Sequence, residues 1–307
     1  MKPIHEYTFP EWLRLYPLIS WVRELRNDVW LNHYLKRKTS ALPEIRRELQ
    51  KKIDATSSRA LLTIVAFEHP WALEFLIEQA AINIGEEFVL FVVDNSRDLQ
   101  KRHEIHKACT EHGITYLALP YNASKHPNRS HGMAMTYAFV NCIRELDMNY
   151  FGFIDHDLIP IKRINLNVHM KEKKFWGLIN KGHNQYWSLW AGFCFFKLKT
   201  YKNEKLNFLY DFSRGLDTGG RNWDKIYAHE NLLQLQLSNS KLSIYQTQAG
   251  QMIQVQIIDD SWMHMSGVSY GNNWKQRGDF FENLRKKLQE GKTIEEAIQN
   301  IAAINGG

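Results

Sequence analysis

The feature that most constrains this chain is a regular alternation of apolar strands and helices between residues 60 and 157. Continuous apolar strands that alternate with helices are typical of a parallel sheet covered on both faces. We therefore expect an α/β half in this region. The predicted strands are ALLTIVAF (60–67), EFVLFVVD (87–94), ITYLALP (114–120) and YFGFID (150–155), and the helices are 70–84, 97–113 and 130–146.

The overall composition is that of a soluble globular protein. Of the 307 residues, 44% are hydrophobic and 23% charged, and the length suits one large domain with additions or two domains. The net charge of +6 attracts anions such as nucleotides, but no basic and aromatic block predicts nucleic-acid binding. The three Cys form no zinc pattern and indicate a reducing compartment. Without a signal peptide or an apolar run of ~18 residues, a cytoplasmic location is expected.

The flanking parts have a different character. Residues 1–58 are aromatic and basic, with helical periodicity over 11–35 and a second predicted helix over 43–54. They predict a helical extension packed on the main domain, or a membrane-surface or partner helix. The second interpretation depends on Trp12, Leu13, Leu15, Trp21 and Trp30 beside Arg14, Arg23 and Arg26.

Beyond residue 157 the alternation gives way to mixed elements. We expect strands over 174–180, 189–198, 241–246 and 254–259, a helix over 229–238, a Gly-rich loop over 261–273 and amphipathic helices over 279–304. The predicted domains are an N-terminal extension (1–58), a main domain (59–270) with halves 59–160 and 161–270, and C-terminal helices (271–307).

Two carboxylates follow the fourth predicted strand, in the sequence Asp155-His156-Asp157. Ligands of open α/β sheets bind at the carboxyl ends of the strands. Residues two apart on an extended strand face the same way, and their oxygens suit Mg²⁺ or Mn²⁺. A solvated Asp-rich turn is the alternative. The position at the end of the fourth strand favours a metal site formed by Asp155 and Asp157.

Two further residues have both a structural and a functional interpretation. Asp94 ends the second strand, where it either caps the next helix or accepts a hydrogen bond from a nucleobase. His264 lies before Gly267, where it is either a third metal ligand or a partly buried structural histidine. As a ligand it would lie on a loop made mobile by Gly267 and Gly271. Metal affinity would then fall below about pH 6.5, since binding requires neutral imidazole.

Several of these segments resemble the nucleotide-diphosphosugar glycosyltransferases of the GT-A fold, in particular the family-2-like group. The segments are LLTIVAFEHPW, VLFVVDNSRD, NRSHGMAMTYAF and YFGFIDHDLIP, which together cover residues 60–160. WAGFCFFKL and HENLLQL extend the resemblance weakly to about residue 235. It implies a Rossmann-like GT-A fold with helical N- and C-terminal extensions, and a metal-dependent hexosyltransferase.

The resemblance also implies the roles of individual residues. The metal, Mn²⁺ or Mg²⁺, would be held by Asp155, Asp157 and His264. The base would be Glu230, although Glu230-Asn231 stands where the family has Glu-Asp; Asp217, in the Gly-rich loop GLDTGGRNWD, competes for this role. Nucleotide-binding residues would be Ala66, Phe67 and Glu68 at the first strand exit, Asp94, the helix opening Ser130, His131 and Gly132, and Asp155 with His156.

The expected function is transfer of a sugar from a nucleotide-diphosphosugar, a UDP-sugar, to a glycan or lipid-linked glycan, as in polysaccharide biosynthesis. The alternatives are a metal-dependent phosphohydrolase or nuclease, and a non-catalytic module that binds nucleotide sugars. No nucleic-acid partner is expected. The expected location is the cytoplasm, where the N-terminal helices could make peripheral contact with the inner face of the membrane. Donor sugar, nucleotide base, stereochemical outcome and oligomeric state stay open.

Overall fold

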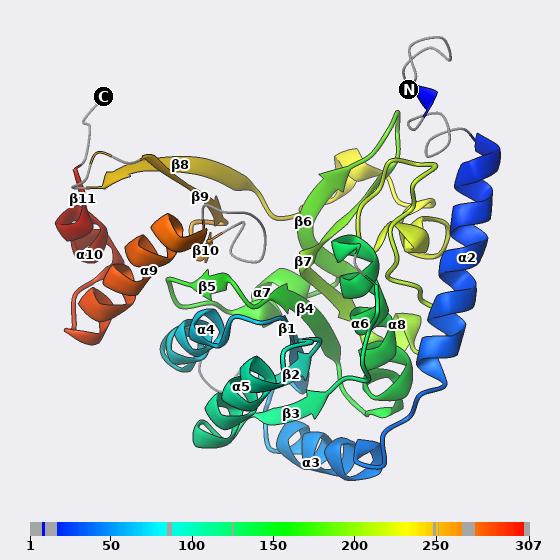
Figure 1. Cartoon of the computed structure of the whole chain (residues 1–307), viewed down its shortest axis with the longest axis horizontal. Coiled ribbons are helices and arrows are strands. Elements are labelled where there is room, and N and C mark those ends of the chain that lie inside the picture. Colours follow the sequence, from blue (N-terminus) through cyan, green and yellow to red (C-terminus); the bar gives the residue numbers. More distant parts are fainter. Residues whose placement is uncertain are drawn as a thin grey trace.

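The main sheet of the protein has six strands in the order β3-β2-β1-β4-β7-β6 (Figure 1). The structure, a computed structural model, describes residues 8–9, 17–84, 88–124, 126–247, 250, 252–265 and 274–303. The first four strands pair in parallel, whereas β7 is antiparallel to both β4 and β6. The strands are β1 (Ala60–Ala66), β2 (Val89–Asp94), β3 (Thr115–Ala118), β4 (Tyr150–Asp155), β6 (Phe175–Lys181) and β7 (Trp187–Lys197). The predicted α/β class is confirmed.

Helices connect the parallel strands and cover both faces of this sheet. The connecting helices are α4 (Pro70–Asn83), α5 (Leu99–Glu111) and α6 (Pro127–Asn141), followed by a 3₁₀ turn (Ile143–Glu145). Pro70 at the start of α4 suits a position where the missing N–H has no partner in the helix. β1 is buried along its whole length because apolar side chains cover it from both sides.

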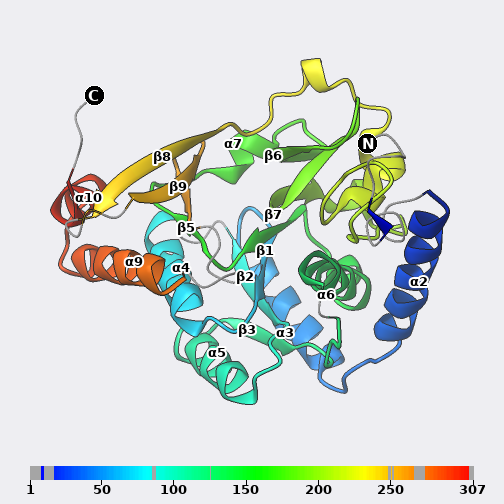
Figure 2. The same cartoon turned by 45° about the horizontal axis from the view of Figure 1, so that its top comes forward.

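A second sheet of five strands has the order β11-β8-β9-β10-β5. Its strands are β5 (Leu158–Pro160), β8 (Ser240–Thr247), β9 (Met252–Ile258), β10 (Trp262–His264) and β11 (Ala302–Ala303). Figures 1 and 2 place this sheet with α9 (Trp274–Gln289) and α10 (Ile294–Ile301) on the side of the main sheet away from α2. Side chains of β9, β10 and α9 share one core with α4 and β5.

The N-terminal segment forms helices α2 (Pro17–Leu35) and α3 (Leu42–Asp54), which pack on the opposite face. Leu31 and Tyr34 of α2 and Leu49 and Ile53 of α3 are buried in the core that also contains α6. The packed helical extension is therefore confirmed. The predicted residues Trp12, Leu13, Arg14 and Leu15 lie outside the described residues.

Three element predictions are corrected by the structure. Residues 229–238 form no α-helix but a 3₁₀ turn (Leu232–Gln234) and an extended segment, because Ser238 pairs with the edge of β6. Helix α6 begins at Pro127 rather than Ser130. His264 lies on β10 rather than in a Gly-rich loop, and Gly267 and Gly271 are outside the described residues. The remaining short elements are α7 (Leu166–Met170), α8 (Leu198–Tyr201), a 3₁₀ turn (Gly220–Asn222) and a π-helical turn (Trp223–Tyr227).

Two general expectations can be compared with the structure. Cys109, Cys142 and Cys194 are all buried and free. Among the described residues, no helix combines the length and apolarity that crossing a bilayer requires.

Candidate functional site

The junction between the two sheets brings together residues that are far apart in the sequence. β4 ends at Asp155, and β5 begins after Asp157. In the pairing of β10 with β5, His264 lies opposite Leu158, and the Met265 N–H donates to the Asp157 carbonyl at 2.9 Å. Residues of the two sheets therefore meet at the carboxyl edge of the parallel strands.

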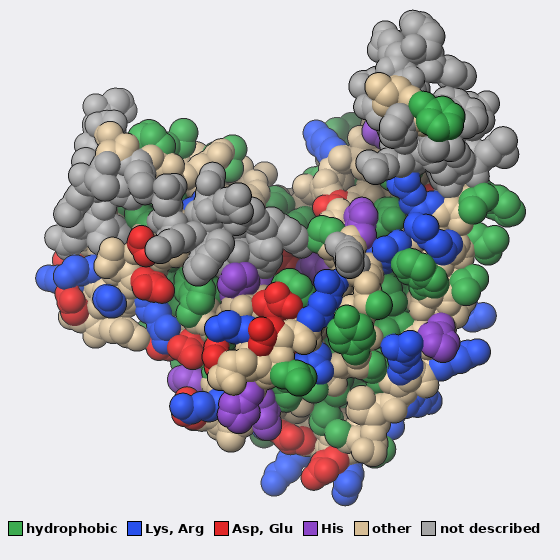
Figure 3. All heavy atoms as spheres, viewed as in Figure 1, with side chains coloured by type: hydrophobic (Ala, Val, Ile, Leu, Met, Phe, Trp, Pro, Cys, Tyr) green, Lys and Arg blue, Asp and Glu red, His purple; other side chains and the backbone are tan. Residues whose placement is uncertain are grey.

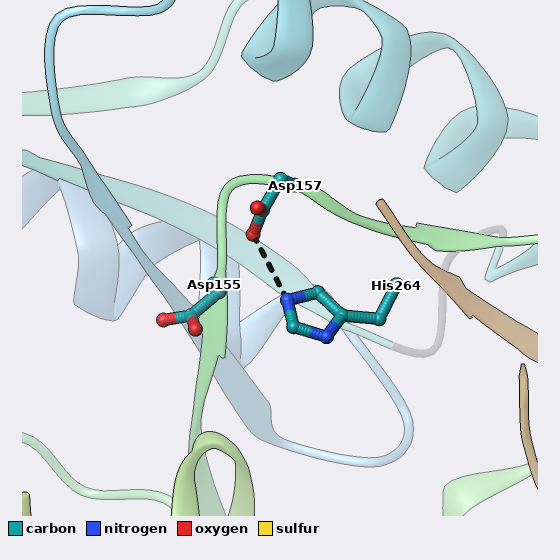
Figure 4. A group of neighbouring side chains, drawn as sticks. All are labelled: Asp155, Asp157 and His264. Carbon is teal, nitrogen blue, oxygen red and sulfur yellow. Dashed lines mark ion pairs between the residues drawn. The ribbon is translucent and has the colours of Figure 1, made fainter. Parts of the chain in front are cut away.

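Asp155, Asp157 and His264 form a cluster with the composition of a metal site. Each offers one ligand atom, and these atoms all lie within 4.8 Å of one another. Figure 4 shows Asp157 and His264 pointing toward each other, with Asp155 beside them. Nε2 of His264 is 3.5 Å from Oδ1 of Asp157. Two carboxylates and an imidazole are donors that fit Mn²⁺, and the carboxylates also fit Mg²⁺.

Gly192 of β7 allows two side chains at this cluster to approach its backbone closely. A Cβ at Gly192 would clash with Oδ2 of Asp155 and with the ring of Trp190. Trp190 in turn packs on His264, with ring centroids 4.7 Å apart. The absence of a side chain at Gly192 therefore lets the Asp155 carboxylate and the indole occupy their positions.

The pKa values of the two carboxyl groups in the cluster are shifted in opposite directions. Burial raises the pKa of Asp155, as does the charge of Asp157, against the opposing effect of His131. Burial also acts to raise the pKa of Asp157, but the neighbouring His264 outweighs it and holds this pKa well below its usual range. For His264, burial acts to lower the pKa, but Asp157 outweighs it and the pKa is raised. Without metal, His264 and Asp157 thus stabilise each other as an ion pair.

A side chain of β9 orients the His264 ring. Nδ1 of His264 lies 3.2 Å from Oε1 of Gln256, and Nε2 of Gln256 donates to Oγ of Ser240 at 3.1 Å. Because an amide oxygen can only accept, Nδ1 carries the proton in this contact. Nε2 is therefore the nitrogen that faces Asp157, as a metal ligand requires.

Further histidines surround the two carboxylates. Nε2 of His131 lies 3.6 Å from Oδ1 of Asp155. His156 is buried, stacks on His69 with ring centroids 6.2 Å apart, and has Nδ1 3.3 Å from the Val65 carbonyl. Burial, followed by the charge of His156, lowers the pKa of His69 to about 4. Nε2 of both His131 and His156 is buried without a hydrogen-bond partner among the described residues, which leaves a donor or acceptor for a bound ligand.

The exit of β1 forms the next part of this edge. Ala66 is buried, and its carbonyl accepts from the Asn95 N–H at 2.9 Å. Glu68 has a positive φ of 54°, a conformation that costs energy for a residue with a side chain. Its Oε1 accepts from the Arg97 N–H at 3.2 Å, and the Arg97 guanidinium lies 6.0 Å from the Phe67 ring centroid. Phe67, Glu68 and Arg97 thus form a partly exposed group beside the carboxylates.

Asp94 is turned away from this edge. Its side chain is fully buried, Oδ1 accepts from the Ser96 N–H and Oδ2 from the Tyr116 hydroxyl, each at 2.8 Å. Both oxygens are therefore satisfied within the chain, and a nucleobase has no access to them here. The helix cap also lies elsewhere, since Asp98 caps α5 by accepting from the N–H groups of Gln100 and Lys101.

Three residues were predicted at the opening of α6. Of these three, it is His131 that lies next to a carboxylate of the cluster, that of Asp155. Ser130 is buried and its hydroxyl accepts from Asn95 Nδ2 at 3.0 Å. A Cβ at Gly132 would clash with the Phe208 carbonyl, so this glycine permits close packing of the helix on the chain. The predicted phosphate-binding amides are not at Ser130, which lies one turn inside the helix.

The two candidate bases lie in different places. Glu230 pairs with Nζ of Lys174 at 2.7 Å, next to the start of β6. Phe175 of β6 and Tyr150 of β4 lie at the end of the sheet opposite Asp155, so Glu230 is not brought to the cluster. Asp217 instead accepts from Nδ2 of Asn128 in the first turn of α6. Asn128 is one helical turn from His131, about 5 Å along the axis.

Sequence reasoning missed Gly192, Gln256 and Arg97. A glycine inside a strand often marks the close approach of another group, so Gly192 in WAGFCFF carried a signal. Arg97 follows the exit of β2 by three residues and could have been found from its place at the strand end. Gln256 had no such signal, because its role arises from the pairing of β9 with β10.

The chain was compared with protein families, with curated proteins and with solved structures. No protein-family model and no curated protein matches the chain. Solved structures similar to it include S. aureus TarS, at 16% identity and TM-score 0.33 over 48% of this chain and 30% of that one. A TarS 1-349 structure matches at 14% identity and TM-score 0.34, covering 48% and 50%.

A third similar structure is glucosyl-3-phosphoglycerate synthase from Mycobacterium tuberculosis in complex with Mn²⁺, UDP and phosphoglyceric acid. It matches at 17% identity and TM-score 0.24, covering 40% of this chain and 39% of that one. The chain spans half or less of the length of these proteins.

Proposed function

We propose that the chain is a metal-dependent glycosyltransferase that moves a hexosyl group from a nucleotide-diphosphosugar, a UDP-sugar, to a glycan or lipid-linked glycan. One observation carries the proposal: Asp155, Asp157 and His264 converge within 4.8 Å at the carboxyl edge of a parallel sheet. This edge is where open α/β sheets bind their ligands. The fit of the donor set, and the position that Gly192 lets the Asp155 carboxylate take, support a divalent ion there.

In this proposal Asp155, Asp157 and His264 hold Mn²⁺ or Mg²⁺. The bound ion would supply neutralisation of the charge on the leaving diphosphate. Phe67, Glu68 and Arg97 would contact the nucleotide from the exit of β1 and from the loop after β2. The guanidinium of Arg97 has a buried Nε without a hydrogen-bond partner in the described part of the chain, which suits an anionic ligand.

Asp217 is the base that we propose for the acceptor hydroxyl. As the acceptor oxygen forms its bond to the anomeric carbon, the bond to the diphosphate breaks and the hydroxyl proton passes to the carboxylate. Asn128 and the Thr218 N–H, which donates to Oδ1 of Asp217 at 2.7 Å, would orient it. Glu230 is less suited, since it pairs with Lys174 at the far end of the sheet.

The experiment that tests this function measures the products formed from UDP-sugars. Slow release of UDP without acceptor, dependent on Mn²⁺ and lost in Asp157→Asn, is the expected result. Release of inorganic phosphate from UDP, or cleavage of DNA, would instead indicate the hydrolase alternative. Binding of UDP-sugar with no turnover would indicate a binding module. The hydrolase is less favoured because it would need more carboxylates to converge on the metal than the two that the cluster contains among the described residues.

The cytoplasmic location and the peripheral membrane contact belong to the same proposal. A lipid-linked acceptor would be reached at the inner face of the membrane, and no nucleic-acid partner is proposed.

A further inference from the structure

The outward face of helix α2 carries large hydrophobic side chains that are mostly exposed. Their spacing places them along one side of a helix, next to each other over successive turns. Single exposed hydrophobic residues are ordinary, but a contiguous group of this size marks an interaction surface. The exposed fractions are 63% for Trp21, 56% for Val22, 51% for Leu25, 57% for Val29 and 43% for Trp30.

The charges of α2 are divided between its two sides. Both of its acidic residues pair with the main domain: Glu24 accepts from the Ser213 hydroxyl, and Asp28, whose side chain is 38% exposed, lies 3.6 Å from Arg221. The exposed charges of the helix and of the residues that follow it are basic. They are Arg26, Lys36, Arg37 and Lys38. The outward face is therefore apolar and cationic, because the two acidic residues of α2 are paired with residues of the main domain.

Aromatic side chains extend this face beyond the helix. Tyr121, which follows β3, is 62% exposed. Together with Trp30, His33 and Arg37 it lines a cavity of about 250 Å³. Arg26 and Arg129 lie over the Trp30 ring, at 5.1 and 4.5 Å from its centroid. Trp and Tyr side chains favour the boundary between water and lipid, where one end is apolar and the other polar.

We propose that this face of α2, with Tyr121, docks on an anionic lipid bilayer. Trp21, Leu25 and Val29 would enter the boundary between headgroups and acyl chains, while the basic side chains contact the headgroups. Figure 3 shows hydrophobic and Lys or Arg side chains gathered along the flank where α2 lies. A second copy of the chain fits less well, because a symmetric contact would bring this basic face of one copy against the same basic face of the other.

Binding of the full chain to vesicles tests the proposal without donor or metal, so its outcome is independent of the transferase activity. Vesicles of phosphatidylcholine are compared with vesicles that contain phosphatidylglycerol. We expect binding to the anionic vesicles only, and weaker binding as salt screens the basic side chains.

Two pairs of substitutions probe the apolar and the basic parts. Leu25→Glu with Val29→Glu should weaken vesicle binding at least about tenfold. The matched control is Leu242→Glu with Ile244→Glu on β8, where the wild-type side chains are 65% and 62% exposed. Lys36→Ala with Lys38→Ala should weaken it about 25-fold, at roughly fivefold for each lost charge. Its control is Arg47→Ala with Lys51→Ala, two exposed basic residues of α3.

Several results would overturn the proposal. One is equal binding to zwitterionic and anionic vesicles, and another is binding that the α2 pairs reduce no more than their controls do. A third is a wild-type dimer in light scattering that Leu25→Glu with Val29→Glu converts to monomer, which would identify the face as a contact between copies. Melting temperatures of all variants should stay close to wild type, because the substituted side chains are exposed.

Discussion

Nε2 of His264 lies 3.5 Å from Oδ1 of Asp157, a residue of the turn that joins β4 of the main sheet to β5 of the second sheet. The contact depends on β5, which continues from the turn after Asp157 and pairs with β10. A change at Asp157 or His264 should therefore alter metal binding directly, whereas a change at their supports should alter it through geometry.

The first prediction concerns Asp157. Asp157→Asn removes one ligand charge, and we expect Mn²⁺ affinity to fall by more than about 100-fold, because even partners of metal ligands contribute 10- to 100-fold. Titration calorimetry with and without UDP measures this. Asp94→Asn is the control: it should lower the free energy of unfolding by about 1.5–3 kcal/mol and leave Mn²⁺ affinity unchanged. Unchanged affinity in Asp157→Asn would remove the metal site.

The second prediction concerns Gly192. Gly192→Ala places a methyl group against Oδ2 of Asp155 and the Trp190 ring, so the carboxylate must move and Mn²⁺ affinity should fall at least about tenfold. Gly152→Ala in β4 is the matched control, since its Cβ would meet the Phe195 ring instead. That control should lose about 1–3 kcal/mol of stability by overpacking while it binds Mn²⁺ normally. The reverse outcome would show that Gly192 serves the core alone.

The third prediction concerns Gln256. Gln256→Leu leaves Nδ1 of His264 without its acceptor, and we expect a loss of about 10- to 100-fold in Mn²⁺ affinity. Gln256→Glu keeps an acceptor oxygen and should restore most of the affinity. Gln254→Leu, at an exposed position of the same strand, should have no effect. If Gln256→Leu and Gln254→Leu bind Mn²⁺ equally well, Gln256 does not orient the ligand.

The fourth prediction concerns pH in metal-free buffer. The raised pKa of His264 means that its contribution to stability is present below the unfolded value of about 6.5 and is lost as pH rises through the folded pKa. The lowered pKa of Asp157 contributes above about pH 3.9, and that contribution is lost as pH falls through its folded pKa. The ion pair should thus stabilise most between about pH 4 and 6.5. Chemical unfolding of wild type and His264→Gln should differ most there and converge as pH rises above the folded pKa of His264.

The same shift changes the expected pH dependence of metal binding. Mn²⁺ competes with the proton on His264, so affinity should begin to fall at a pH above 6.5, higher than an ordinary histidine predicts. Binding at pH 7 should release a proton, which calorimetry in buffers of different ionisation enthalpy detects. A midpoint at or below pH 6.5 would contradict the raised pKa.

The fifth prediction separates the candidate bases. Asp217→Asn should lower kcat for transfer by about 100- to 10,000-fold with little change in Mn²⁺ affinity, the range expected for loss of a general base. Glu230→Gln should leave kcat within about threefold, because this carboxylate pairs with Lys174 at the other end of the sheet. A large loss in Glu230→Gln together with a normal Asp217→Asn would restore the assignment that the family resemblance implies.

The parts of the site that could be predicted are those that depend on local pattern. Asp155 and Asp157 stand at the end of a continuous apolar strand, and strand ends of α/β sheets gather at one edge. His264 was a candidate through its residue type and the nearby Gly267. Its approach to Asp157 depends on the pairing of β10 with β5, two short strands far apart in the chain, which no local pattern contains.

Tertiary contacts decided the helix prediction that failed, and they also set the surroundings of two predicted site residues. The apolar residues of HENLLQLQLS were assigned to a helix, although LLQLQL also alternates with the period of a strand. Pairing of Ser238 with the edge of β6 decided the outcome. Asp94 has the chemistry to bind a nucleobase, but the Tyr116 hydroxyl takes its free oxygen, and this partner comes from the neighbouring strand β3. The role of Glu230 as the base stays a prediction of the family resemblance, and in the structure its carboxylate pairs with Lys174.

The dependence of the cluster on β10 has a consequence for biosynthesis. A growing chain carries Asp155 and Asp157 well before the ribosome reaches His264, so an early folded intermediate has the aspartates without the histidine. Closing the long loop between them costs conformational entropy before the late pairing with β5 can compensate. Assembly of the complete ligand set is therefore one of the last folding events. Under the proposed function, tight metal affinity would therefore appear only after the C-terminal sheet has docked.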